Sequence, residues 1–179
     1  MTGKRHEPST VWLTGLSGAG KSTLATALRA RLDANGRACT ILDGDVLRRG
    51  LCADLGFSAA DRHENVRRVA EVARILNDAG VVAIVALISP LTSDRLTARH
   101  VIGSDRFLEA YVRTALATCI ERDPKGLYRK ALAGEIPDFT GISAPYEEPL
   151  TPALVLETER MTVDACVESL LNLLTRSGD

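Results

Sequence analysis

The sequence predicts a doubly wound α/β fold, in which helices cover both faces of one parallel sheet. Short apolar runs suited to strands alternate along the chain with longer segments whose apolar residues recur at helical spacing. Residues 81–88 are apolar at every position, as in a central strand covered on both faces. A glycine-rich loop lies between the first predicted strand and the first predicted helix. In such folds, ligands bind beyond the carboxyl ends of the strands.

The individual elements are predicted from helix start and stop signals and from the periodicity of apolar residues. Asn35-Gly36 is a stop signal after the first helix, and Ser58 begins a capping box that opens a long helix ended by Gly80. Strands are predicted at residues 11–14, 38–42, 81–88, 107–112 and 154–156, and helices at 22–32, 46–51, 58–79, 92–102, 115–122, 127–133 and 163–174.

The stretch 134–149 contains three prolines and two glycines without strong periodicity. A loop of this length in a compact domain is typical of a lid or a binding loop. We therefore expect a single domain over residues 1–179, with a flexible N-terminus at 1–9 and a lid and substrate loop at about 124–149.

Composition excludes several classes of protein. The net charge is −1, so no basic field indicates a nucleic acid partner. The N-terminus lacks the apolar segment of a signal peptide, and the longest apolar run is too short to span a bilayer. The four cysteines form no C-x-x-C pair, which favours reduced thiols in a cytoplasmic protein; they are Cys39, Cys52, Cys119 and Cys166. Composition leaves the oligomeric state open, and a homodimer is compatible with it.

One motif carries the strongest chemical signal. It fits the phosphate-loop pattern G-x-x-x-x-G-K-[ST], and it consists of Gly15, Leu16, Ser17, Gly18, Ala19, Gly20, Lys21, Ser22 and Thr23. The glycines let backbone N–H groups turn toward a phosphate, and the following helix directs its positive end at the same anion. Lys21 suits the β- and γ-phosphates of ATP, and the Ser22 hydroxyl suits Mg²⁺. A glycine-rich turn that matches by chance is the alternative.

Two further predicted strands lead into polar residues. Asp43 and Asp45 follow the second strand, and Ser89 follows Ile88 at the end of the third. Together with the strand that leads into the phosphate loop, these strand ends should open onto one crevice. One carboxylate could hold Mg²⁺ while the other accepts the proton of an attacking hydroxyl. A solvated turn is the alternative, because Asp-Gly is a common turn pair.

A cationic cluster follows the second strand. Arginines surround an aromatic ring, and Arg62, Asn65 and Arg68 recur on one side of the predicted long helix. Such a face is usually solvated. Beside a crevice and an exposed ring, however, it favours an anionic substrate with a planar base. The cluster contains Arg48, Arg49, Phe57, Arg62, His63, Asn65, Arg67 and Arg68, of which His63 is expected to be an ordinary surface histidine.

Together these strings resemble the adenylylsulfate kinase family over roughly residues 11–157. The similarity includes the phosphate loop, Leu42-Asp43-Gly44-Asp45, Asp54-Leu55-Gly56-Phe57-Ser58, Asp61-Arg62 with Glu64-Asn65 and Arg67-Arg68, Ile88-Ser89-Pro90, Arg122-Asp123-Pro124-Lys125-Gly126-Leu127-Tyr128, and Phe139-Thr140-Gly141-Ile142 with Pro145-Tyr146-Glu147. The combination is more specific than the phosphate loop, which many unrelated NTPases share.

The resemblance implies a P-loop kinase that transfers the γ-phosphoryl of ATP to the 3′-hydroxyl of adenylylsulfate. It implies catalytic roles for Lys21, Asp43, Asp45 and Ser89, with Asp45 as base and Asp43 with Ser22 on the Mg²⁺ side; the family tradition describes the serine at position 89 as a phosphorylated intermediate. It adds Arg122 to the ATP site and places a mobile lid over ATP from residue 125 onward. The implied acceptor contacts are Arg48, Phe57, Arg62, Asn65, Ile88, Ser89, Lys125, Leu127 and Phe139, with the two phenylalanines on either side of the adenine.

The sequence also departs from the family. Leu87 and Leu91 stand where aromatic residues are usual, Val112-Arg113-Thr114-Ala115 replaces Val-Asp-Thr-Pro, and Leu47 and Arg49 are unusual after Asp-Gly-Asp. A related kinase for another anionic nucleotide or small alcohol is therefore one alternative, and a nucleotide-dependent switch is a second. With no long N-terminal extension, the chain is expected to be the kinase alone rather than a fusion with the sulfurylase.

Overall fold

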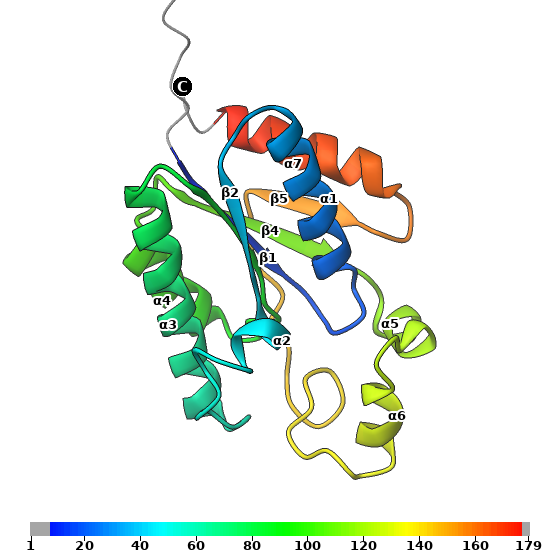
Figure 1. The fold of residues 1–179 in the computed structure, drawn as a ribbon. Helices are drawn as coiled ribbons and strands as arrows, with labels where there is room; N and C mark the ends of the chain where they lie inside the picture. Colours follow the sequence, from blue (N-terminus) through cyan, green and yellow to red (C-terminus); the bar gives the residue numbers. More distant parts are fainter. Residues whose placement is uncertain (1–7, 177–179) are drawn as a thin grey trace, which may run out of the picture.

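The computed structural model describes residues 8–176 and contains a five-stranded parallel sheet (Figure 1). Its strand order is β2-β3-β1-β4-β5, so the chain moves first to one side of β1 and then to the other. This reversal is the topological switch point at which doubly wound folds bind ligands. The strands are β1 (Thr10–Thr14), β2 (Cys39–Asp43), β3 (Val82–Ala86), β4 (Phe107–Arg113) and β5 (Leu154–Glu157).

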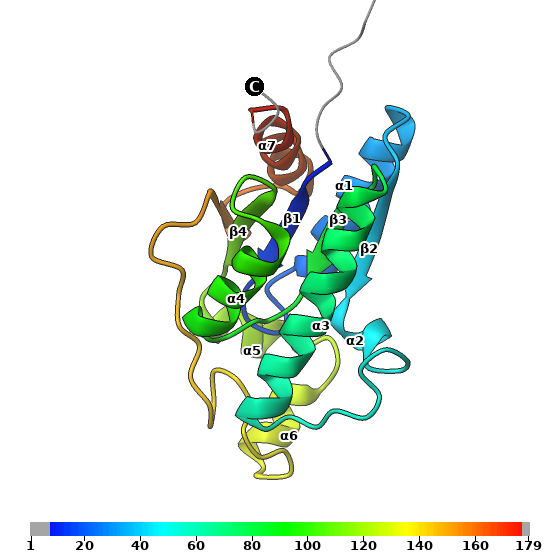
Figure 2. The same cartoon turned by 90° about the vertical axis from the view of Figure 1, so that its left-hand side faces the viewer.

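Helices cover both faces of the sheet, as predicted. Figures 1 and 2 show α1 and α7 on one face and α3 and α4 on the other. Every helix except α2 lies within a few residues of its predicted position. The helices are α1 (Lys21–Ala34), α2 (Gly44–Leu47), α3 (Ala59–Asp78), α4 (Thr92–Ile102), α5 (Leu116–Arg122), α6 (Leu127–Leu132) and α7 (Val163–Arg176).

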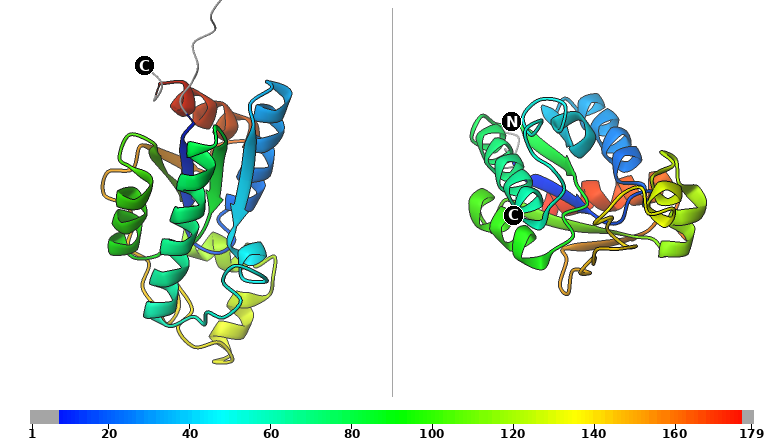
Figure 3. Two further views of the ribbon diagram at one scale, coloured as in Figure 1. Left: turned by 60° about the vertical axis from the view of Figure 1, so that its left-hand side comes forward. Right: turned by 90° about the horizontal axis from the view of Figure 1, so that it is seen from below.

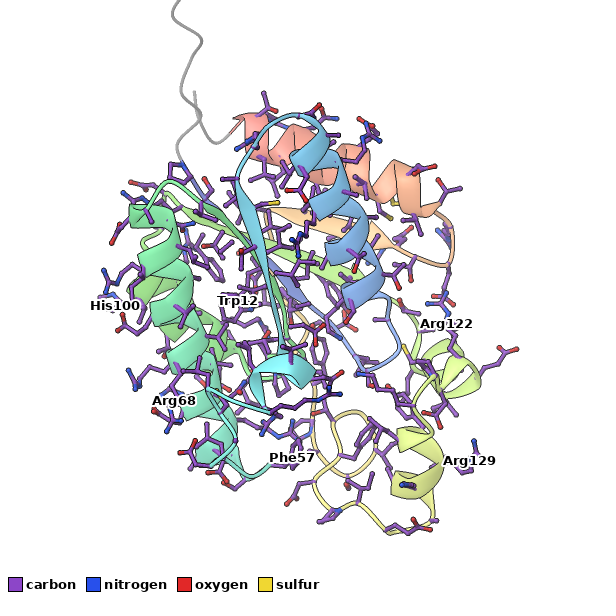
Figure 4. All side chains as sticks on the ribbon, viewed as in Figure 1. Trp12, Phe57, Arg68, His100, Arg122 and Arg129 are labelled. Atoms are coloured by element: carbon purple, nitrogen blue, oxygen red, sulfur yellow. The ribbon has the colours of Figure 1, made fainter. Side chains whose placement is uncertain are left out.

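The alternation of side chains along β1 divides the core into two layers. Val11 and Leu13 are fully buried against α1 and α7, whereas Trp12 is fully buried on the opposite face with α3 and α4. This follows from the two-residue period of a strand, since neighbouring side chains point to opposite faces. Figure 4 labels Trp12 within the sheet. A strand buried on both faces favours apolar residues throughout, which is why residues 11–13 of β1 and the whole of β3 read as continuous apolar runs.

Local capping decides where two helices begin. The Ser58 hydroxyl accepts a hydrogen bond from the Asp61 amide at 3.1 Å, which confirms the predicted cap of α3. The short helix α2 was predicted at residues 46–51, and that position is wrong. The Asp43 side chain accepts from the Asp45 amide at 2.9 Å, so the helix already begins at Gly44 and gives way to turns after Leu47.

Beyond the carboxyl ends of the strands, α5, α6 and the irregular segment that follows α6 extend below the sheet (Figures 1 and 3), and Tyr128 and Phe139 join the core cluster that contains Val11 and Leu13. Residues 1–7 of the predicted flexible N-terminus lie outside the described residues, and Ser9 is buried. Among the described helices, none combines the length and apolar character needed to cross a bilayer.

Candidate active site

A cavity of about 1240 Å³ opens where β1, β2 and β3 end. The three strand ends therefore meet at one crevice, as predicted. The cavity brings together most of the predicted site residues: Ser17, Gly18, Ala19, Gly20, Lys21, Ser22, Thr23, Asp43, Asp45, Arg48, Phe57, Arg62, Asn65, Ile88, Ser89, Arg122, Lys125, Leu127 and Phe139. Gly15 does not line it, and Leu16 faces a neighbouring pocket.

The phosphate loop has the backbone geometry that its glycines allow. Gly15 has φ 152°, and a Cβ there would lie only 2.5 Å from the Val112 carbonyl oxygen. Gly20 has φ 107° and forms the N-cap of α1. Side chains would be strained or blocked at both positions, so the loop depends on these glycines. The N-terminus of α1 consequently faces the cavity, where an anion is favoured.

Lys21 lies at the centre of this loop. Its ammonium donates to the Gly15 and Leu16 carbonyl oxygens at 2.8 and 2.7 Å. Burial lowers the pKa of Lys21 to about 8, although the neighbouring Asp43 and Asp45 carboxylates oppose this shift. A lysine in this state is charged at neutral pH but only weakly solvated, so it is ready to exchange carbonyl partners for phosphate oxygens.

Ser22 and Asp43 lie together at the edge of the loop. The Ser22 hydroxyl donates to Asp43 Oδ2 at 2.6 Å, while Asp43 Oδ1 accepts from the Asp45 amide. A hydroxyl and a carboxylate side by side fit Mg²⁺, which takes few protein ligands and completes its shell with phosphate and water. The solvated-turn alternative does not explain why Asp43 contacts the loop.

Asp45 points in another direction from Asp43. Its carboxylate pairs with the Lys125 ammonium, which comes from the segment between α5 and α6. Both side chains are half exposed. The two aspartates are therefore already distinguished by their surroundings, one beside the loop serine and the other beside a cation from the predicted lid.

Phe57 forms one wall of the cavity beyond Asp45. Its ring is 57% exposed, and the Arg48 guanidinium lies over it at 4.2 Å from the centroid. Arg62 donates to the Phe57 carbonyl oxygen at 3.0 Å and to the Asp138 carbonyl oxygen at 2.7 Å. Arg62 thus connects the start of α3 with the residue before Phe139. Figure 4 places Phe57 on the α3 side and Arg122 on the α5 side.

Phe139 forms a more rigid part of the lining. Its side chain is 8% exposed and packs edge to face against Tyr128, with ring centroids 5.1 Å apart. The Tyr128 hydroxyl donates to the Ser17 carbonyl oxygen at 2.9 Å, which ties α6 to the phosphate loop. Nearby, the buried Asn65 Oδ1 has no hydrogen-bond partner within the described part of the chain.

Ser89 lines the cavity although the residue is buried. The residue is 3% exposed, and its Oγ accepts a 3.0 Å hydrogen bond from the indole N–H of Trp12. Its φ of 40° lies in the left-handed region, which is uncommon for a non-glycine residue. In this conformation the hydroxyl is hydrogen-bonded to the fully buried Trp12 side chain.

Part of the cationic cluster lies outside the cavity. Arg67 and Arg68 pair with Glu64, and Arg68 also pairs with Asp54 at 2.7 Å, so these two arginines follow the solvated alternative. His63 is exposed, as expected for a surface histidine, and its Nδ1 contacts Asp94 Oδ1 at 2.8 Å.

The sequence missed a wall that follows β5. Thr158, Met161, Val163 and Cys166 line the cavity, and Arg122 donates to Thr158 Oγ1 at 3.3 Å. These residues match no motif. The rule that ligands bind beyond strand ends could have found them, because residue 158 directly follows β5.

The fold and this cavity define a class of protein. A phosphate loop at the switch point of a parallel sheet binds a nucleoside triphosphate, and a basic, aromatic-lined second half of the same cavity offers an acceptor site. This is the arrangement of a P-loop kinase.

Comparison with known proteins gives the family. The family model for adenylylsulphate kinase matches residues 7–157. An adenylyl-sulfate kinase from Prochlorococcus marinus is 53% identical over 169 residues, which cover 94% of this chain and 84% of the relative. The chain therefore belongs to the adenylylsulfate kinase family, whose members are ATP-dependent transferases.

Solved structures agree. The Mycobacterium tuberculosis APS kinase in complex with AMPPNP and APS has a TM-score of 0.91 and 47% identity, over 94% of this chain and 98% of that one. A hexameric APS kinase from Thiobacillus denitrificans has a TM-score of 0.73 and 37% identity, with 97% of this chain covering 30% of that longer one.

Proposed function

We propose that this chain phosphorylates adenylylsulfate on its 3′-hydroxyl with ATP, through the residues that line the cavity. One observation carries the proposal: the phosphate loop, the Asp43 and Asp45 carboxylates and the basic wall around Phe57 open into one cavity. The Mycobacterium tuberculosis relative, a complex with AMPPNP and APS, supports the same pair of substrates.

The donor half would hold the phosphates of ATP. The loop amides, the N-terminus of α1 and Lys21 supply positive potential for the β- and γ-phosphates, and Arg122 borders the loop near Gly18. Ser22 and Asp43 would hold Mg²⁺. When bound, the ion offsets charge that develops on the transferred phosphoryl group.

The acceptor half would hold the adenine and the phosphosulfate. Phe57 and Phe139 offer apolar ring surface for the base, and the backbone of Ile88 and Ser89 borders it. Charged and polar groups from α3, the α2–α3 connection and the lid face the anionic part of the acceptor. These groups are Arg48, Arg62, Asn65 and Lys125, and Leu127 adds apolar surface to the acceptor half.

The transfer step assigns Asp45 as base. The acceptor 3′-oxygen forms a bond to the γ-phosphorus while the bond from that phosphorus to the β–γ bridging oxygen breaks, so ADP leaves. Asp45 takes the proton of the hydroxyl, and Lys21 follows the phosphoryl group electrostatically. Before this step, Lys125 has to release Asp45, because the pairing occupies the carboxylate that must accept the hydroxyl proton. Direct transfer needs no phosphorylated Ser89.

The domain, lid and assembly predictions extend this proposal. We infer one domain in which residues 124–149 close over both substrates. A homodimer and a cytoplasmic location remain predictions, as does the absence of nucleic acid and membrane partners. Light scattering of the purified chain tests the first of these.

A coupled assay tests the proposed reaction. ADP release is measured with ATP and Mg²⁺, with and without adenylylsulfate, and phosphorus NMR identifies the product. We expect turnover that requires the acceptor and a 3′-phosphorylated product. Slow ADP release that adenylylsulfate does not stimulate would instead favour the nucleotide-dependent switch.

A kinase for another acceptor is the second candidate. Leu87 lines the cavity at a position where the family usually has an aromatic residue, so the acceptor wall of this chain has its own shape. A panel of anionic nucleotides and small alcohols decides between the two. Higher kcat/KM with any other acceptor would favour the second candidate.

A further inference from the structure

Arg95 is a buried arginine outside the cavity lining. It lies in the first turns of α4 and is 3% exposed, yet it is not among the cavity residues. Burying a guanidinium is costly unless partners compensate its charge and satisfy its N–H groups. The identity of those partners therefore indicates what the residue is for.

The Arg95 guanidinium connects three segments that are distant in sequence. Its Nε contacts Glu109 Oε1 on β4 at 2.8 Å. One terminal nitrogen donates to the Ser89 carbonyl oxygen at 2.8 Å, and the other donates to the Glu147 carbonyl oxygen at 2.8 Å. The planar fork of an arginine can satisfy several acceptors in fixed directions, which a lysine ammonium cannot reproduce.

The first of these segments is the turn that borders the acceptor half of the cavity. Ser89 has a left-handed backbone, and such a conformation persists only where its surroundings impose it. Arg95 donates a hydrogen bond to the Ser89 carbonyl oxygen, and the Trp12 indole N–H donates to the Ser89 hydroxyl at 3.0 Å. The Thr14 hydroxyl donates to the neighbouring Ile88 carbonyl oxygen at 2.7 Å. Hydrogen bonds from side chains of β1 and α4 thus fix the conformation of the 88–90 turn.

The second segment continues from Phe139. The Glu147 amide donates to the Pro90 carbonyl oxygen at 2.8 Å, and its carboxylate accepts from the Thr92 amide at 2.7 Å. With the Arg95 contact, Glu147 is held by three hydrogen bonds at the base of the turn. The strap, our name for residues 139–147, begins with a turn at 141–143 and therefore has a fixed end beside Ser89.

We propose that Arg95 is a positioning residue for the acceptor: it holds the 88–90 turn and the strap that carries Phe139 in one fixed relation, and it leaves the donor half untouched. The inference rests on the proposed function, since it concerns the acceptor half of that cavity. Arg95 touches neither the phosphate loop nor any residue proposed to bind ATP, and its polar contacts are Ser89, Thr92, Glu109 and Glu147.

Steady-state kinetics with both substrates varied provide the first test. Arg95→Met alone would leave the Glu109 carboxylate without the positive charge that compensates it. We therefore combine Arg95→Met with Glu109→Gln in one double variant. We expect this double variant to lose about 10²-fold in kcat/KM for adenylylsulfate, as a small misplacement of a substrate can cost, while the KM for ATP stays at the wild-type value.

Two single variants sharpen the kinetic test. Arg95→Lys keeps the positive charge near Glu109 but cannot reach all its acceptors together, so it should keep thermal stability while the acceptor KM still rises. Arg99→Met removes an exposed arginine from the same helix and should match the wild type. Full rescue of the acceptor KM by Arg95→Lys would show that charge compensation is the whole role, and would overturn the proposal.

Trp12 supplies a readout that does not depend on activity. It is the only tryptophan of the chain, and its indole N–H donates to Ser89. We expect the ligand-free Arg95→Lys and double variants to shift the Trp12 emission toward that of Ser89→Ala, which lacks the acceptor of this bond. Arg99→Met should leave the emission unchanged.

The outcomes separate the two proposals. A wild type that fails to phosphorylate adenylylsulfate refutes the proposed function, while the Trp12 emission of the Arg95 variants still reports whether Arg95 holds the turn. Unchanged acceptor KM and unchanged emission in folded Arg95→Lys and double variants would refute the role of Arg95. An equal rise in both KM values would also refute it, because the effect would then not be confined to the acceptor half.

Discussion

The donor and acceptor halves of the cavity are built in different ways. The donor half comes from one contiguous loop, and backbone groups of that loop hold its side chains. The Lys21 ammonium, for example, donates to the Gly15 and Leu16 carbonyl oxygens. The acceptor half comes from segments up to about a hundred residues apart. Arginine side chains join them, for example Arg62 between the Phe57 and Asp138 carbonyl oxygens.

This difference separates a general function, phosphate binding by the loop, from a specific one, recognition of the acceptor by the assembled wall. A contiguous loop can serve any reaction of a nucleoside triphosphate, which is why phosphate loops occur in unrelated enzymes. An assembled wall can change by substitution at one segment without disturbing the loop. We therefore expect three classes of variant: those that impair the donor half, those that impair the acceptor half, and those at the junction, where the carboxylates between the two halves lie.

The largest effect is expected at the junction. Asp45→Asn keeps the shape of the side chain but cannot take a proton, so it should lower kcat by about 10²–10⁴-fold, with little change in either KM. Steady-state kinetics measure the effect. The exposed Asp105→Asn is a matched control for loss of one carboxylate and should behave as the wild type.

Asp43 gives the contrasting result at the same strand end. Asp43→Asn should raise the Mg²⁺ concentration needed for half-maximal turnover, because its carboxylate contacts Ser22 beside the phosphates. Titration of Mg²⁺ in both variants distinguishes the roles. Rescue of Asp45→Asn by Mg²⁺, with no rescue of Asp43→Asn, would require that the two roles be exchanged.

The sequence predicted the donor half far better than the acceptor half. The nine loop residues carry their own geometry, and Ser58 identifies the start of α3 through a local hydrogen bond. By contrast, the hydrogen bond from Trp12 to Ser89 joins residues 77 positions apart. No local pattern indicates that the Ser89 hydroxyl turns into the core, or that Ser89 adopts a positive φ. Such features follow from tertiary packing.

Resemblance to a family predicted more of the acceptor half than periodicity did. Phe57 and Phe139 were paired only through the similarity, and both line the cavity. The similarity ended near residue 157, so the wall formed by Thr158 and Met161 was missed. Their position after β5 is a consequence of sheet order, which no single motif encodes.

Loss of Lys21 should impair the donor half alone. Lys21→Ala removes a preorganised positive charge from the transferred phosphoryl group, and turnover should fall by at least about 10²-fold. Circular dichroism should show a retained fold, because the loop glycines rather than Lys21 set the backbone. Near-normal turnover in a folded Lys21→Ala protein would contradict the assignment of this loop to the donor.

Loss of Phe57 should impair the acceptor half alone. Stacking of a base on an aromatic ring contributes roughly 1–3 kcal/mol, so Phe57→Ala should raise the KM for adenylylsulfate about tenfold. The KM for ATP should barely move. Leu150→Ala, at an apolar side chain that is 92% exposed, is the control. A larger change in the ATP KM than in the acceptor KM would break the division of the cavity into two halves.

The smallest predicted effect is a pH dependence confined to the donor half. Burial lowers the pKa of Lys21 to about 8 in the nucleotide-free protein. Bound phosphates favour the charged ammonium and therefore raise this pKa, so binding above pH 8 is coupled to uptake of a proton. The affinity for a non-hydrolysable ATP analogue should consequently fall as pH rises, by about fourfold between pH 7 and 8.5.

The sign of this effect is opposite to that for folding. An unfolded lysine keeps its proton to a higher pH than the native Lys21. Between about pH 8 and about pH 10.5, the unfolded state therefore binds more protons, and the Lys21 contribution to stability rises with pH. Calorimetric titration of the analogue at several pH values measures the first trend, and Lys21→Ala should abolish it. If the acceptor affinity fell over the same range by the same factor in the wild type, the titrating group would not be Lys21, and the donor half would not be electrostatically independent of the acceptor half.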